Sequence, residues 1–107
     1  MNTKNPINTK KTINIELMDC VSGTATSSDA MALFIKLESA IKAKSKVRLS
    51  LKNATVLTSS FLNASFGEIY DKYGYSAIQN NIVLVNYLPS QAKAIKKYLG
   101  DVKKLVR

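Results

Sequence analysis

Apolar residues recur along this chain with two different periods. A period of two places side chains on one face of a strand, whereas spacing of three or four places them on one side of a helix. Alternating segments cover 12–17 and 47–51, a short apolar run covers 82–85, and helical spacing covers 28–43, 60–73 and 90–99. Strands that alternate with helices predict an α/β domain with a small, mostly parallel sheet, three helices and right-handed crossovers. The predicted order is β-α-β-α-β-α.

Local signals refine these elements. The run Ile82–Val85 is apolar without alternation, which is typical of a strand buried on both faces. Gly74 and Gly100 follow the second and third helical segments and are expected to end them. Because three strands make a thin sheet, we also expect an additional edge strand from residues 4–9 or 75–79.

The chain of 107 residues has the length of one domain. Residues 1–11 are polar and predict a flexible basic tail, residues 12–100 form the predicted domain, and residues 101–107 predict a second basic tail. The first residues contain no apolar signal-peptide core, and no apolar run reaches the ~20 residues of a membrane helix. We therefore expect a cytoplasmic protein that is not inserted in a membrane.

The chain lacks most of the groups that enzymes use. It contains no histidine and a single cysteine, Cys20, which excludes most pairs of nucleophile and base. No cluster of Cys, His or acidic residues has the spacing of a metal site, and the glycines are too isolated for a phosphate-binding loop. We expect no enzymatic activity, no cofactor and no metal, and a buried structural role for Cys20.

Basic residues dominate the charge, and the formal net charge is +9. They gather in two clusters, Lys42, Lys44, Lys46, Arg48 and Lys52, and Lys93, Lys96, Lys97, Lys103, Lys104 and Arg107. Such a charge attracts nucleic acid, an anionic membrane surface or an acidic protein, but a solvated lysine-rich surface has the same composition. Because the clusters contain little arginine and few aromatic residues, any nucleic-acid binding is expected to be weak and indifferent to sequence.

Three consecutive hydroxyl residues, Thr58, Ser59 and Ser60, lie between the strand at 47–51 and the helix at 60–73. Ser59 or Ser60 is expected to cap the helix by accepting a hydrogen bond from a backbone amide, which stabilises by about 1 kcal/mol. A phosphate on this turn would meet the helix's free amides and add about −1.5 to −2 charges to any interface that covers it.

The segment around this turn resembles a known family. The pattern Leu49-x-Leu51-x-x-Ala54-x-x-Leu57-Thr58-Ser59-Ser60-Phe61-Leu62 is similar to the signature of STAS domains, the fold of bacterial anti-sigma factor antagonists. In that family Asp-Ser-Ser-Gly-Leu opens the helix and the first serine is the phosphoacceptor, a position that Ser59 occupies here. The Ser-Phe pair and the long helix after it resemble a STAS-like group of small bacterial proteins, many of which accompany histidine-kinase-type ATPases.

The resemblance covers residues 12–99 in element order, but only the fourteen residues 49–62 match as a motif. Thr58 stands where the antagonists have the Asp that the cognate kinase recognises, and Phe61 stands where they have Gly. The chain is therefore expected to be a divergent member of the family.

The leading hypothesis is a regulatory module that binds a protein partner, such as a kinase-type ATPase, through the Thr58–Phe61 turn and the exposed side of the following helix. Ser59 would be the cap and candidate phosphoacceptor, Thr58 and Ser60 flanking contacts, and Phe61 either an apolar anchor or a core residue. The alternatives are a small basic binder of nucleic acid or anionic surfaces, and a mobile-element-encoded inhibitor of a host protein.

Overall fold

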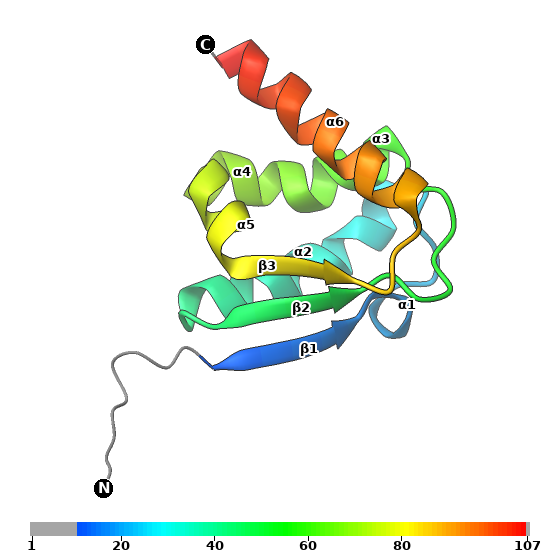
Figure 1. Cartoon of the computed structure of the whole chain (residues 1–107), viewed down its shortest axis with the longest axis horizontal. Helices are drawn as coiled ribbons and strands as arrows, with labels where there is room; N and C mark the ends of the chain where they lie inside the picture. Colours follow the sequence, from blue (N-terminus) through cyan, green and yellow to red (C-terminus); the bar gives the residue numbers. More distant parts are fainter. Residues whose placement is uncertain (1–10, 107) are drawn as a thin grey trace, which may run out of the picture.

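The computed structural model describes the backbone of residues 11–106 and the side chains of residues 11–100. The elements are β1 (Thr12–Glu16), α1 (Leu17–Cys20), α2 (Ser27–Lys42), β2 (Lys46–Ser50), α3 (Ser59–Leu62), the π-helical turn η2 (Asn63–Gly67), α4 (Glu68–Tyr73), α5 (Tyr75–Asn81), β3 (Ile82–Val85) and α6 (Pro89–Val106) (Figure 1). The predicted α/β class and the three predicted strands and helices are confirmed within a few residues, except at the end of α6.

The described strands form one parallel sheet in the order β1-β2-β3. Its register places apolar side chains side by side on one face: Ile13 beside Val47 and Ile82, and Ile15 beside Leu49 and Leu84. Helices cover this face (Figure 1), and Val47 and Leu49 of the central strand have no exposed surface. The core therefore lies between the sheet and a single layer of helices.

The opposite face of the sheet is open and carries polar side chains. Thr12, Asn14 and Glu16 of β1 and Lys46 and Arg48 of β2 are all exposed. The alternation of 12–17 and 47–51 in the sequence reflects this one-sided burial, since each strand sends every second side chain into water.

The prediction that Ile82–Val85 is buried on both faces is wrong. Val83 is 52% exposed and the other three residues are only half-buried. The reason is that Val83 lies on the open face of the sheet beside Arg48 of β2, and that β3 is an edge strand of this sheet.

The predicted extra strand at 75–79 is also wrong, because these residues belong to α5. Gly74 ends α4 with a φ of 86°, as predicted, and α5 begins at the next residue. Ile78 then packs into the core, which a helix achieves here without a fourth strand. The other candidate, residues 4–9, lies outside the described residues.

Helix α6 does not end at Gly100 but continues through Val106, so the backbone of the predicted basic tail is helical up to that residue. Glycine stops a helix by adopting a left-handed conformation, and Gly74 is the one described glycine with a positive φ. Inside a helix Gly costs only about 1 kcal/mol relative to Ala, which neighbouring turns of a long helix can offset.

Truncation to alanine should cost more stability at a buried position of the sheet than at an exposed one. Leu51 is 2% exposed, so Leu51→Ala should lower the free energy of unfolding by about 2–5 kcal/mol. Leu84→Ala should cost less, because Leu84 is half-buried. The control is Val83→Ala on the open face, expected within about 0.5 kcal/mol of wild type. Urea unfolding curves measure all three, and a loss at Val83 as large as at Leu51 would contradict the one-sided core.

Candidate functional site

The hydroxyl turn begins a helix that is capped by Thr58. Thr58 has extended backbone angles, φ −75° and ψ 161°, and its Oγ1 accepts a hydrogen bond from the Phe61 amide at 3.1 Å. Ser59 and Ser60 are the first two residues of α3. The prediction that one of these serines is the cap is therefore wrong by one or two positions. Any of the three hydroxyls could cap a helix, and tertiary contacts of Thr58 decide which one does.

These contacts tie Thr58 to the loop that precedes α2. The Thr58 amide donates to the Thr24 carbonyl at 3.2 Å, and the Thr58 hydroxyl donates to the Ala25 carbonyl at 2.8 Å. Thr24 is itself buried, and its hydroxyl donates to the Val56 carbonyl at 2.6 Å. The start of α3 is thereby fixed relative to the start of α2, although the two segments lie more than thirty residues apart.

Gln91 of α6 holds the other side of the same loop. Its side chain is buried, its Nε2 donates to the carbonyls of Ala54 and Thr55 at 2.9 and 3.2 Å, and its Oε1 accepts from the Leu88 amide at 2.8 Å. Sequence reasoning missed Gln91 and Thr24. For Gln91 a signal existed, since it occupies an inward helical position four residues before Ile95 and is polar.

Apart from the cap Thr58, the structure divides the predicted site residues into two groups. Ser59 and Ser60 are exposed, and their hydroxyls make no hydrogen bond within the described part of the chain. Phe61 is only 1% exposed and belongs to the core. Of the two roles left open for Phe61, core residue is correct, and an apolar anchor for a partner is excluded in this conformation.

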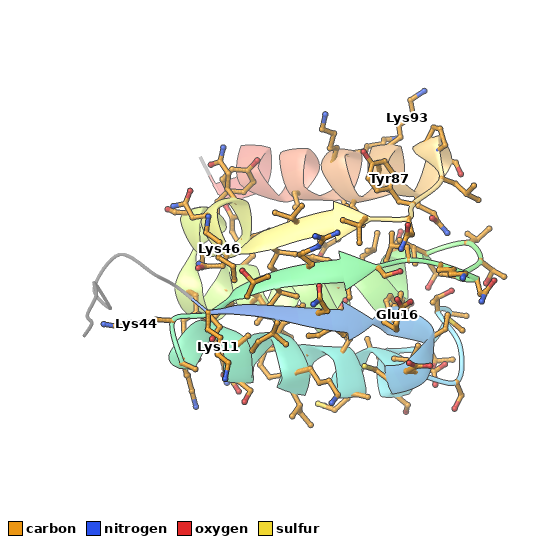
Figure 2. The ribbon with its side chains drawn as sticks, turned by 60° about the horizontal axis from the view of Figure 1, so that its bottom comes forward. Lys11, Glu16, Lys44, Lys46, Tyr87 and Lys93 are labelled. Atoms are coloured by element: carbon orange, nitrogen blue, oxygen red, sulfur yellow. The ribbon has the colours of Figure 1, made fainter. Side chains whose placement is uncertain are left out.

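An apolar surface lies next to the turn, and sequence reasoning did not find it. Val56 is 76% exposed and Leu88 is 59% exposed. Both line a shallow groove of about 380 Å³ that Ala54, Leu57 and Ala94 also border. Val56 lies in a loop without periodicity, so no pattern marks it. Figure 2 places Tyr87, which precedes Leu88, at the end of the sheet where the strands finish.

Beyond the hydroxyl turn, α3, the π-helical turn η2 and α4 follow one another without a gap and form one helix. Inside it the Ser65 hydroxyl donates to the Phe61 carbonyl at 2.7 Å, which satisfies a buried acceptor. Tyr98 of α6 crosses this turn and donates to Asn63 Oδ1 at 2.9 Å. A Cβ on Gly67 would lie 2.5 Å from the Tyr98 oxygen, so only glycine allows this close approach. Burial, with smaller contributions from Asp71 and Glu68, raises the pKa of Tyr98.

The lysine clusters do not merge into one surface. Lys44 and Lys46 lie where the strands begin, while Lys93 lies at the start of α6, well apart from them (Figure 2). Among the described side chains the one ion pair joins Lys72 to Glu38 at 3.2 Å, so these three lysines have no acidic partner there. The Tyr73 hydroxyl also donates to Glu38, and this hydrogen bond, followed by the charge and hydrogen bond of Lys72, keeps the pKa of Glu38 below its usual value.

Cys20 is half-buried and packs against the core, which is less burial than the sequence predicted. Burial raises the pKa of its thiol, and Lys36 partly opposes this effect. Across residues 11–100, whose side chains the structure describes, no three His, Cys, Asp or Glu side chains are grouped as they would be to hold a metal ion. Over the same part of the chain, no helix has the length and apolar content needed to cross a membrane.

Comparison with known proteins identifies one family. The family described as STAS-like domain of unknown function (DUF4325) matches residues 29–91, which is more than half of the chain and includes the hydroxyl turn, α3, α4 and β3. No curated protein matches the chain, and no solved structure does.

The identity of the cap can be tested by stability. Thr58→Ala removes the cap and the bond to the Ala25 carbonyl, and should lower the free energy of unfolding by about 1–2 kcal/mol. Thr58→Ser keeps both bonds and should recover most of this loss. Ser59→Ala, which was expected to remove a cap, should stay within about 0.5 kcal/mol of wild type. Thermal and urea unfolding give these differences, and a larger loss at Ser59 than at Thr58 would contradict the observed capping.

Proposed function

This chain belongs to the STAS-like domain family, and on that basis we propose that it is a non-catalytic regulatory module that binds a protein partner at the hydroxyl turn. The observation that carries the proposal is the state of Ser59 and Ser60, two exposed hydroxyls on a rigidly held turn. The hydroxyl that the fold needs belongs to Thr58, which leaves both serines available for another molecule.

The surroundings of the two serines support a protein partner. The exposed Val56 and Leu88 provide an apolar contact next to the polar turn. Apolar side chains with a polar rim are typical of protein–protein interfaces. The hydrogen bonds of the Thr24 and Gln91 side chains keep this surface in one conformation, which reduces the conformational entropy lost when a partner binds.

Phosphorylation of Ser59 or Ser60 is the regulation that we propose for this surface. A phosphate on the first turn of a helix lies near free amides and the positive end of the helix dipole, so the fold tolerates it. The same phosphate changes the charge that a partner meets by about −1.5 to −2. A kinase-type ATPase, which the resemblance to anti-sigma factor antagonists implies, would be both partner and kinase.

The proposal that the module is non-catalytic rests on the environment of the same hydroxyls. The chain has no histidine. Neither Ser59 nor Ser60 is hydrogen-bonded to a Lys, Asp, Glu or Tyr side chain among the described residues. A serine nucleophile needs such a base within hydrogen-bond reach.

A charge substitution tests the proposed surface. Tagged full-length wild type recovers the partner from lysate, and affinity is then measured for Ser59→Asp and Ser60→Asp. Both variants should fold normally, because acidic residues suit the first turn of a helix, and both should change the affinity for the recovered partner at least about tenfold. Ser76→Asp is the matched control, since Ser76 is the exposed second residue of α5. An equal effect at Ser76, or none at the turn, would show that the turn is only a helix start.

A second candidate function, binding of anionic surfaces, rests on the lysines that lack acidic partners. If they bind nucleic acid, the affinity should be weaker than about 1 μM at physiological salt and should fall steeply as salt increases. Fluorescence anisotropy with single- and double-stranded oligonucleotides of unrelated sequence measures this. Tight binding with a clear preference for one sequence would favour this function over the first.

A further inference from the structure

The outer edge of β1 is not paired with any other described strand. The Lys46 amide donates to the Lys11 carbonyl at 2.8 Å. In a parallel ladder this bond directs the peptide groups of odd-numbered residues of β1 towards β2, and those of Thr12, Asn14 and Glu16 away from it. The amides of Thr12, Asn14 and Glu16 and the carbonyls of Thr12 and Asn14 therefore face the open edge, whereas the Glu16 carbonyl, at the N-cap of α1, is used in the first turn of that helix.

A groove runs beside this edge, between β1 and α2. It has a volume of about 450 Å³ and is lined by Ile13 and Ile15 of the strand, by the small residues Ser39 and Ala40 and the longer Lys36 of α2, and by Ala43 at the end of that helix. Small side chains on α2 leave room for another chain to approach the strand. Natural sheets often protect such an edge with a proline, a bulge or a covering element, and none of these occurs at 12–16 in the described structure.

The charges along this edge change sign from one end to the other. Lys11, Lys44 and Lys46 lie where β1 begins, and Glu16 lies where it ends (Figure 2). Asp19 follows Glu16 in α1 and lines the same groove. An edge with a basic start and an acidic end is complementary to a copy of itself that runs in the opposite direction.

We propose that β1 pairs antiparallel with β1 of a second copy of this chain, about a two-fold axis at Asn14. This register sets Asn14 opposite Asn14 of the second copy and Thr12 opposite its Glu16. The amide and carbonyl of Asn14 are then hydrogen-bonded to those of Asn14 in the second copy, and each Glu16 amide donates to the Thr12 carbonyl of the other copy. The two sheets join into one, with strand order β3-β2-β1-β1-β2-β3.

The register also matches the side chains. On the covered face, Ile13 meets Ile15 of the second copy, next to the small residues of α2. On the open face, Glu16 faces Thr12 of the second copy, beside which lies Lys46 in the register of β1 with β2. Each dimer therefore contains two Glu16–Lys46 pairs between copies, related by the two-fold axis.

Sedimentation of the full-length chain over a range of concentrations tests the proposal. At 0.15 M salt the Debye length is about 8 Å, so the net charge of +9 on each copy is largely screened. Wild type should form a reversible dimer. Asn14→Pro should weaken dimerisation at least about tenfold while the monomer stays folded, because the lost amide faces away from β2. Asn14→Ala is the control and should dimerise as wild type does.

A charge exchange provides a test that does not depend on the folding of a proline variant. Glu16→Lys alone should weaken the homodimer, since the introduced lysine then faces Lys46 of the second copy. Lys46→Glu alone should weaken it as well, because the introduced glutamate then faces Glu16 of the second copy. A mixture of the two variants should form heterodimers. In such a heterodimer the introduced lysine faces the introduced glutamate, and the unchanged Glu16 of one copy faces the unchanged Lys46 of the other, so both pairs carry opposite charges.

Two results would overturn the proposal. A wild type that is monomeric at every soluble concentration would show that the edge is left open or is covered by residues 1–10 or another protein. A dimer whose affinity is unchanged by Asn14→Pro and by both charge variants would place the interface elsewhere. Neither result bears on the hydroxyl turn, whose test uses affinity for a different protein.

Discussion

The burial of β2 on one face is the constraint on which the rest of this structure depends. Val47 and Leu49 are fully buried against the helices, while the alternating residues Lys46 and Arg48 face water. Because one layer of helices covers the sheet in the described part of the chain, β1 and β2 alternate and the opposite face stays open. The exposure of Val83 on β3 follows from the same one-sided cover, and β1 and β3 remain as edge strands. The surfaces that could bind other molecules are thus consequences of how the core is closed.

The hydroxyl turn shows how long-range hydrogen bonds assign roles that local sequence leaves undecided. Thr58, Ser59 and Ser60 are equally able to cap a helix, but only Thr58 reaches the carbonyl of Ala25. This contact requires the loop before α2 to lie beside the turn, which Thr24 ensures through the Val56 carbonyl. Once Thr58 is used in this way, the two serines have no structural task in the described chain. Because Thr58 has the structural role, its two neighbours are free for the partner contact and phosphorylation that we propose.

The sequence predicts the elements of this fold well because they are written in local periodicity. Strands 12–17 and 47–51 alternate, and both occur close to their predicted bounds. The failures concern features that depend on distant residues. The apolar run at 82–85 does not reveal that β3 lies at an edge, and Gly100 does not reveal whether neighbouring turns hold the helix through it. Likewise, the burial of Phe61 and the exposure of Val56 depend on contacts that no local pattern records.

The hydroxyl turn and the edge of β1 use different parts of the molecule, and this separation has a functional consequence. The turn follows β2 in the chain, and Gln91 of α6 holds the loop that leads to it. The unpaired edge belongs to β1, next to the groove between β1 and α2. A dimer formed through β1 would therefore leave both turns exposed and present two identical binding surfaces. Two linked sites can engage a dimeric partner with an avidity above that of either site alone. A phosphate on one or both turns would then change binding in steps, which would give the proposed module a graded response.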